Sequence, residues 1–321
     1  MNPPPPFQPA AWLRNRHVQT VYAALFAPSP RVAMRRERWD APDGDFVDVD
    51  FLDGPDDAPW VNLFHGLEGS ADSPYARMLM GLVAERGWRG SVMHFRGCSG
   101  EPNRMPRAYH SGDSEEVDWV LRRIAARAAP APLYAAGVSL GGNALAKWLG
   151  ERGEEAKRVV ARAAAVCAPL DLMAAGDALE RGFARAYTHH FLISLKRGAE
   201  QRLERFPGLF DPEKVRRART LRDFDNVVTA PLHGFRDTDD YWTRASAKPW
   251  LAKVAVPTLI LNARDDPFLP ESALPTQRDV SAAVKLEFPD RGGHVGFVTG
   301  PFPGRIDWLP RRLLHFFEYA Q

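Results

Sequence analysis

Cysteine is scarce in this sequence, where Cys98 and Cys167 are the only two among 321 residues. Two thiols are too few for a disulfide framework or a cysteine-rich zinc cage, and they are typical of a reducing compartment. Cys98 has no Cys-x-x-Cys partner, so we interpret it as a packed small side chain rather than a nucleophile. We therefore expect a cytoplasmic protein that holds no metal ion.

Neither sign of charge dominates the chain, which has 42 Lys and Arg residues against 40 Asp and Glu residues. Proteins that bind nucleic acid usually carry a basic excess or a basic tail, so we expect no nucleic-acid partner. The hydrophobic share of 45% is ordinary for a soluble globular protein, and a chain of this length can bury one large core.

Long hydrophobic runs are also missing. The N-terminus lacks the basic start and the apolar stretch of a signal peptide, so we expect none. The longest uncharged stretch, 128–146, is long enough to raise the question of a membrane span. It contains Pro130, Pro132 and three glycines, which divide it into a strand, a turn and a helix start. We therefore predict no transmembrane segment.

Short apolar runs alternate with helical stretches along most of the chain. Residues 31–53 indicate a hairpin, with alternating polarity in 46–51 and a turn at Asp43-Gly44. Further strands are predicted at 60–64, 91–95, 133–138, 163–168, 258–261 and 284–288, and helices at 75–86, 115–127 and 308–319. This alternation predicts an α/β fold with a mostly parallel central sheet, covered by helices on both faces and bordered by the antiparallel N-terminal hairpin.

One region breaks the alternation. From about residue 170 to residue 253 the pattern indicates helices and loops but no convincing strand. A long segment without strands between two core strands predicts an inserted helical cap. We therefore divide the chain into an N-terminal arm (1–30), a core (31–169 and 254–321) and the cap insertion (170–253).

A Gly-x-Ser-x-Gly motif spans 137–141, directly after one predicted strand and before a helical stretch. A serine held in a sharp strand–turn–helix presents its hydroxyl as a nucleophile, and small flanking residues let neighbouring chains pass close by. The motif alone is common, but its strand and helix context favours a nucleophile over an ordinary turn. We therefore predict that Ser139 is catalytic.

A serine hydroxyl needs a general base, and the base needs an acid to orient it. His294 lies in a glycine-rich loop after the last predicted strand, from which it can reach over the end of the sheet. Asp265 and Asp266 both follow the strand at 258–261, and either could serve as the acid. The position of Ala263 after that strand favours Asp266, which would leave Asp265 to cap a helix or pair with an arginine.

An oxyanion hole requires two backbone N–H groups that point at the developing negative charge. Leu140 follows Ser139 directly and is expected to supply one of them. The second is expected from the loop 65–70, which follows an early strand and begins His-Gly; Leu67 is the preferred donor. The other reading of this loop is a plain glycine turn.

Longer motifs make a family resemblance specific. They are Asn15-Arg16-His17-Val18-Gln19-Thr20, His65-Gly66-Leu67-Glu68-Gly69-Ser70, the segments 73–75, 93–104 and 109–112, Asp265-Asp266-Pro267-Phe268, and Gly292-Gly293-His294-Val295-Gly296-Phe297. Together with the Ser139 motif they resemble the YheT-like family of bacterial α/β-hydrolases across nearly the whole chain. That family is assigned to esterases and is similar to eukaryotic membrane-associated hydrolases of lipid esters. The resemblance implies the α/β-hydrolase fold, whose order of triad residues is also Ser, Asp, His.

Other features have two readings each. Phe183, Tyr187, Phe191 and Leu195 recur every four residues, so they share one helix face that could line an acyl pocket or form the packing seam of the cap. We take the three aromatic residues as candidate substrate-binding residues. The polar segment 96–113 could form a wall of the site, but a salt-bridged loop is favoured. The basic run 214–219 is interpreted as a solvated helix face rather than a membrane-binding surface.

These residues predict hydrolysis of a small-molecule ester, short-chain or lipid-like, through an acyl-enzyme on Ser139. No cofactor is needed for that chemistry. Thioesterase, amidase or acyltransferase activity would use the same triad and stays open as an alternative. A ligand-binding protein that has kept the fold without turnover is the remaining alternative.

Overall fold

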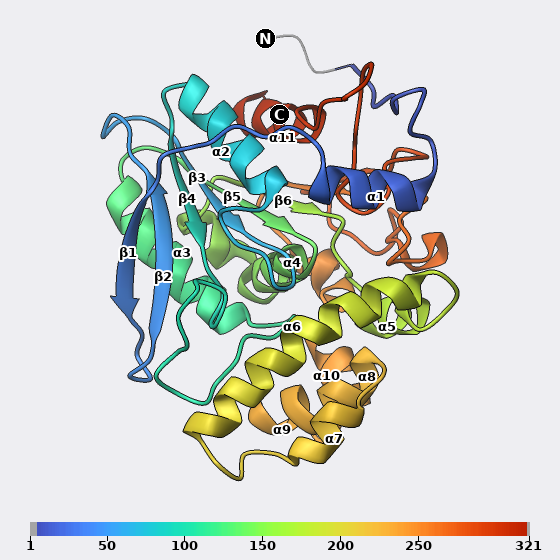
Figure 1. Ribbon diagram of the computed structural model, residues 1–321. Coiled ribbons are helices and arrows are strands. Elements are labelled where there is room, and N and C mark those ends of the chain that lie inside the picture. Colours follow the sequence, from blue (N-terminus) through green and yellow to red (C-terminus); the bar gives the residue numbers. More distant parts are fainter. Residues whose placement is uncertain (1–4, 320–321) are drawn as a thin grey trace.

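A computed structural model describes residues 5–319; the first four residues of the predicted arm and the last two of the predicted core lie outside this range. Eight strands in the described chain form one sheet, in the order β1-β2-β4-β3-β5-β6-β7-β8 (Figure 1). Their bounds are β1 Arg35–Asp40, β2 Phe46–Leu52, β3 Trp60–Phe64, β4 Arg89–Met93, β5 Leu133–Val138, β6 Arg162–Val166, β7 Thr258–Leu261 and β8 Val284–Glu287.

The sheet is antiparallel at one edge and parallel elsewhere. Strand β1 pairs with β2, and β2 with β4, in antiparallel register, whereas every pair from β4 to β8 is parallel. The turn between β1 and β2 includes Gly44 at a φ of 84°, which glycine adopts without strain. The predicted mostly parallel sheet with an antiparallel N-terminal hairpin is confirmed.

Helices cover both faces of this sheet. On one face α2 (Pro74–Glu85) packs with α11 (Trp308–Tyr319), and on the other α3 (Ser114–Ala128) packs with α4 (Leu140–Arg152). The central strands β3, β5 and β6 are therefore buried on both sides, which explains why their sequences are mostly apolar rather than alternating. Parallel strands also bring their carboxyl ends to one edge of the sheet, where the loops that carry the predicted site residues meet.

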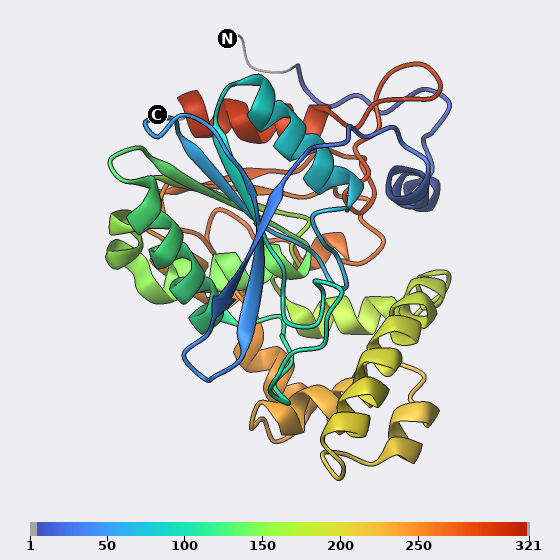
Figure 2. The same cartoon turned by 60° about the vertical axis from the view of Figure 1, so that its left-hand side comes forward.

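The N-terminal arm contains a helix that the sequence pattern did not predict. Helix α1 (Arg16–Leu25) begins after Asn15, whose side chain accepts hydrogen bonds from the backbone N–H groups of His17 and Val18. Figure 2 shows α1 at the periphery of the molecule, away from the sheet. Its position matters because the loop that carries His294 packs against it.

Between β6 and β7 the described chain contains helices and turns. They are α5 (Leu172–Leu179), α6 (Ala184–Arg205), α7 (Pro212–Arg217), α8 (Leu221–Phe224), α9 (Ala230–Leu232) and α10 (Thr238–Ala245), with 3-10 and π turns between them and after them. Helices α6 to α10 form the lower part of the molecule in Figure 1. They enclose a small core of their own, to which Leu192, Phe210 and Phe224 contribute. No helix within residues 5–319 is both long and apolar enough to span a membrane.

Candidate active site

Ser139 lies at the turn between β5 and α4, with φ at 52° and ψ at −120°. The two glycines of the motif are required by close backbone approaches. A Cβ added at Gly137 would lie 2.4 Å from the Gly141 carbonyl oxygen, and one at Gly141 would lie 2.5 Å from the His65 carbonyl oxygen. The sharp turn that exposes the serine is therefore possible only because both neighbours lack side chains.

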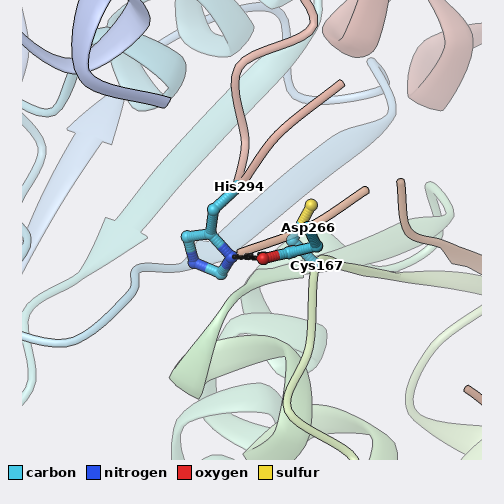
Figure 3. A group of neighbouring side chains, drawn as sticks. All are labelled: Cys167, Asp266 and His294. Carbon is cyan, nitrogen blue, oxygen red and sulfur yellow. Dashed lines mark hydrogen bonds and ion pairs between the residues drawn. The ribbon is translucent and has the colours of Figure 1, made fainter. Parts of the chain in front are cut away.

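The predicted base and acid lie next to this serine. His294 Nε2 is 3.0 Å from Ser139 Oγ, and His294 Nδ1 is 2.9 Å from Asp266 Oδ2. Figure 3 shows the His294 ring facing the Asp266 carboxylate. With Nδ1–H donating to the carboxylate, Nε2 carries the free lone pair and can accept the serine proton. The ring of Phe268 stacks on the imidazole at a centroid distance of 4.0 Å.

The two adjacent aspartates have different partners. Asp266 is 3% exposed, and its Oδ1 also accepts the Phe268 backbone N–H at 2.8 Å. The Asp265 carboxylate instead accepts the backbone N–H of Gly293 at 2.9 Å, one residue before His294. Asp265 therefore contacts the loop that carries the imidazole rather than the imidazole itself. Of the two aspartates, only Asp266 hydrogen-bonds to the imidazole, and its role as the acid stays a prediction.

Helix α1 supports the His294 loop from the opposite side. Thr20 Oγ1 accepts the His294 backbone N–H at 2.9 Å and donates to the Arg16 carbonyl at 2.8 Å. A Cβ at Gly293 would lie 2.6 Å from the Arg16 carbonyl oxygen, and one at Gly296 would lie 3.0 Å from the Gln19 carbonyl oxygen. The glycines around His294 are thus explained by tight packing of the loop on α1.

The loop after β3 presents its backbone next to Ser139. The amides on either side of Leu67 are both occupied, because Gly66 N–H donates to the Tyr75 hydroxyl and Glu68 N–H donates to the Tyr109 hydroxyl, each at 2.9 Å. Glu68 has a φ of 55°, which turns the chain at this point. The two tyrosines therefore hold the loop on both sides of the amide that was predicted as an oxyanion donor.

His65 shapes the same loop from inside the protein. Its Nδ1 is 2.7 Å from the Gly66 carbonyl, and its Nε2 accepts the Phe95 backbone N–H at 3.1 Å. Burial lowers the pKa of His65 to about 3, so the ring is neutral, with Nδ1–H as donor and Nε2 as acceptor. This histidine supports the backbone and is not a second catalytic base.

Leu140 is the first residue of α4, so its amide is one of those at a helix N-terminus that have no partner within the helix. The helix dipole adds positive potential at this end. Gly66, one residue before Leu67, packs against the serine from the other side, since a Cβ there would lie 3.2 Å from Ser139 Cβ. The two predicted donors, Leu67 and Leu140, thus come from loops that meet at the nucleophile.

A family model described as the alpha/beta hydrolase fold matches residues 59–301, which is most of the chain. The chain belongs to the α/β-hydrolase family. It is 41% identical to the Escherichia coli (strain K12) protein named "Putative esterase YheT" over 96% of this chain and 91% of that protein. It is also 30% identical to the Mus musculus protein named "Phospholipase ABHD3", over 97% of this chain and 78% of that protein. The predicted YheT-like resemblance is confirmed, and these relatives indicate a hydrolase.

Solved structures agree on the fold of this hydrolase. An esterase from Exiguobacterium antarcticum superposes with a TM-score of 0.57 at 17% identity, covering 89% of this chain and 100% of that chain. A bacterial membrane phospholipase A superposes with a TM-score of 0.56 at 18% identity, covering 95% of this chain and 90% of that chain. At such low identities the likeness concerns the arrangement of strands and helices alone.

Cys167 lies beside the acid and the base, and these three side chains form the one group in residues 5–319 with metal-ligand spacing (Figure 3). Burial raises the pKa of Cys167 well above the ordinary thiol value, so the thiolate that a metal would need is disfavoured. Its sulfur accepts the Val295 backbone N–H at 3.3 Å, and His294 Nδ1 is already bonded to Asp266. The donor set therefore fits a hydrogen-bonded triad rather than a metal site.

A cavity of about 490 Å³ opens at Ser139 and His294 and extends beneath the helices of the 170–253 segment. One part of its wall is apolar, and its members include Leu172, Leu179, Phe191, Leu195, Phe224 and Leu269. Another part carries arginines of α6, namely Arg197, Arg202 and Arg205. The lining of the cavity beside Ser139 thus combines apolar side chains with arginines.

The three predicted substrate-binding residues lie in different places. Phe191 lines the cavity, whereas Phe183 and Tyr187 do not. Phe183 is 61% exposed and contacts His17 at a ring distance of 4.7 Å, and Tyr187 hydrogen-bonds to His17. The expectation that all three line one pocket is therefore revised: α6 lines the cavity from Phe191 to its C-terminal end at Arg205, whereas Phe183 and Tyr187 precede that part.

The segment 96–113 combines both of its readings. Arg96 is buried and pairs with Asp43, Asp45 and Glu116 at 2.6–3.1 Å, which ties this loop to the hairpin and to α3. The same segment contributes cavity-lining residues, among them Tyr109. It is a salt-bridged loop on its outer side and a wall of the cavity on its inner side.

Three supporting residues escaped sequence reasoning. Thr20 and Tyr109 occur in motifs that carried the family resemblance, but nothing local tells which atoms they contact. Asn143 is fully buried on α4; its amide donates to the carbonyls of Ser111 and Ala245 and accepts the Ala247 N–H. It joins α4 to the end of the helices between β6 and β7, and its only signal was an amide among the small and apolar residues 140–146.

Proposed function

We propose that this protein is a serine hydrolase that cleaves carboxylic esters through an acyl-enzyme, with Ser139 as nucleophile, His294 as base and Asp266 as acid. The observation that carries the proposal is the hydrogen-bonded chain from Ser139 Oγ through the imidazole to the Asp266 carboxylate. A serine at a sharp turn with an imidazole 3.0 Å from its hydroxyl suits nucleophilic catalysis.

In the first half-reaction, Ser139 Oγ bonds to the ester carbonyl carbon while its proton passes to His294 Nε2. The backbone N–H groups of Leu67 and Leu140 then bind the oxyanion. The bond to the alcohol breaks, and the alcohol leaves with the proton from Nε2. Water next attacks the acyl carbonyl and gives a proton to the same Nε2, and Ser139 recovers that proton as the acid leaves.

The substrate that we propose is a short-chain or lipid-like ester, with the 170–253 segment serving as a cap over the acyl group. An apolar wall that begins at the nucleophile suits an acyl chain. The similarity to proteins named as phospholipases, at 30% identity over 97% of this chain, supports the lipid-like member of that pair. Phe191 is the aromatic residue of the predicted stripe that would contact the chain.

A fluorophosphonate probe tests the nucleophile, because only an activated serine reacts with it quickly. We expect labelling of the purified protein at Ser139, mapped by peptide mass spectrometry, and none in Ser139→Ala. That variant should lose p-nitrophenyl ester hydrolysis by about 10³-fold or more, because a triad acts as a unit, while keeping its circular dichroism spectrum. Activity retained within about tenfold would refute the assignment of Ser139 as the nucleophile. A wild-type protein that is neither labelled nor able to hydrolyse any ester would favour a ligand-binding protein.

A panel of matched substrates separates the reactions that share this triad. The panel contains an ester, a thioester and an anilide that carry the same acyl group. We expect the oxygen ester to have the highest kcat/KM of the three. Preference for the thioester by more than about tenfold would replace the ester in the proposal.

A further inference from the structure

Helix α1 exposes a row of large apolar side chains. Val18 is 49% exposed, Leu25 is 69% exposed, and Phe26, directly after the helix, is 65% exposed. Their spacing, i, i+7 and i+8, places them on one side of the helix, with Tyr22 at i+4 between them. A helix on the surface of a globular protein normally turns such a row toward the core.

The inward side of α1 is the polar one. Its buried residues are Gln19, Thr20 and Ala23. Gln19 donates to the Leu13 carbonyl and accepts the Val298 N–H, and Thr20 accepts the His294 N–H. Hydrogen bonds of Gln19 and Thr20, together with the packing of Ala23, therefore hold α1 to the protein, while its large apolar side chains Val18 and Leu25 face outward. Packing within this chain gives no reason for three exposed apolar residues in a row.

The exposed row continues into neighbouring aromatic residues. Trp12 is 39% exposed and contacts Tyr22 at a ring distance of 5.0 Å and Phe302 at 5.5 Å. Phe302 is itself 74% exposed. We call Trp12, Val18, Leu25, Phe26 and Phe302 the α1 patch. Figure 2 shows α1 nearly end-on at the edge of the molecule, where a flat surface can approach it.

The segment that carries most of the patch has charge of one sign, although Asp307 lies near Trp12. Residues 1–34 include Arg14, Arg16 and Arg31 and contain no Asp or Glu. Trp and Tyr rings beside basic side chains are typical of protein segments that lie at a lipid headgroup layer. The basic run 214–219 lacks this combination, because no large apolar side chain in it is exposed. Charge complementarity therefore points to an anionic lipid surface at α1 rather than at α7.

We propose that the α1 patch docks this hydrolase on anionic lipid surfaces and so brings the catalytic loop to lipid-like esters at the interface. The proposal rests on the proposed function only for the identity of the substrate; docking itself needs no turnover. Because Thr20 bonds both α1 and the His294 backbone, the docked helix and the catalytic base belong to one hydrogen-bonded unit. Lipid would cover the apolar side, and the arginines would contact the headgroups.

Vesicle flotation tests the docking directly. The protein should float with phosphatidylglycerol vesicles and roughly tenfold less with phosphatidylcholine vesicles at low salt. Leu25→Asp/Phe26→Asp should reduce flotation with the anionic vesicles by about tenfold or more, because it places two negative charges on the apolar side. The matched control is Ile193→Asp, which alters a residue of similar exposure, 60%, on α6 and should float like the wild type.

Two further measurements separate docking from catalysis and from self-association. Flotation is repeated in Ser139→Ala, which should float normally even if the proposed chemistry is wrong. Turnover of p-nitrophenyl butyrate should be unchanged within about twofold in Leu25→Asp/Phe26→Asp, since neither residue touches the site. Equal flotation of the double variant and the wild type would overturn the proposal. So would a dimer by light scattering that the double variant abolishes, with no flotation in either protein.

Discussion

The catalytic turn and the inserted helices meet at one cavity but are built differently. Around Ser139 the backbone itself makes the contacts: the glycines of the motif admit no Cβ, and the amides on either side of Leu67, in the loop 65–70 (the proposed oxyanion loop), are bonded to tyrosines. Around α6 the cavity wall is made of side chains such as Phe191 and Arg202, whose sizes and charges are free to vary. Under the proposed function, backbone geometry specifies the chemistry and side chains specify the choice of substrate.

The largest expected effect sharpens this contrast within the catalytic region. Asp266→Asn should lower turnover by about 10⁴-fold, because an amide cannot hold the His294 tautomer that accepts the serine proton. The matched control is Asp265→Asn, which should lose far less turnover and more thermal stability, since Asp265 bonds to a backbone amide. Steady-state kinetics measure the turnover of both variants, and thermal melts measure their stability. A larger loss of turnover in Asp265→Asn than in Asp266→Asn would assign the acid role to Asp265.

The next effect concerns the junction between the two regions. Asn143→Ala should lower the free energy of unfolding by about 3 kcal/mol, because three buried backbone groups lose their partner. Urea unfolding measures this change. Glu204→Ala on the exposed side of α6 is the control, with an expected change within about 0.5 kcal/mol. Equal stability of the two variants would mean that the inserted helices are held without Asn143.

A smaller effect should follow from loosening the oxyanion loop. Tyr109→Phe removes the hydroxyl that accepts the Glu68 N–H, so kcat should fall by about tenfold while KM stays within about twofold. Tyr241→Phe is matched, since Tyr241 also lines the cavity but bonds to Ser111 rather than to the oxyanion loop. A KM change without a kcat change would assign Tyr109 to substrate binding instead.

The smallest effect lies in the inserted helices and probes specificity alone. Phe191→Ala should shift the preferred p-nitrophenyl ester toward longer chains, because one methylene in an apolar pocket is worth about 1–3 kcal/mol. Phe183→Ala should keep the wild-type length profile, since its ring lies outside the cavity and is 61% exposed. Equal profiles for all three proteins would show that the acyl chain lies elsewhere, against the 96–113 segment for example.

Local patterns predicted the sheet, which is confirmed, and singled out the three residues of the proposed triad, which lie within hydrogen-bond distance of one another. Ser139 and His294 each stand in a glycine setting that restricts the backbone, and the buried strands are apolar because helices cover both faces. Asp266 was preferred over its neighbour from its spacing after a strand. These glycine settings, apolar runs and spacings each involve only a few consecutive residues, so they can be recognised in a single sequence.

The remaining features depend on partners that are distant in sequence. Thr20 and His294 are separated by 274 positions in the sequence. Nothing near Thr20 indicates which backbone N–H will donate a hydrogen bond to its hydroxyl. The periodicity of α6 grouped Phe183 with Phe191 correctly on one face but could not tell where along the helix the cavity lies. Helix α1 was not predicted because its large apolar residues face outward. Hydrophobic periodicity identifies a helix from apolar residues that face the core.

The stacking of Phe268 on His294 has a consequence for engineering. Phe268 belongs to the loop after β7, yet it packs with Tyr187 and Phe191 of α6 at ring distances of 4.8 and 5.8 Å. The Phe268 ring thus contacts both the imidazole and the helix α6. A chimaera that exchanges only 170–253 for the corresponding stretch of another hydrolase would set foreign side chains against this ring. The transplant unit should therefore include position 268, although it lies outside the insertion.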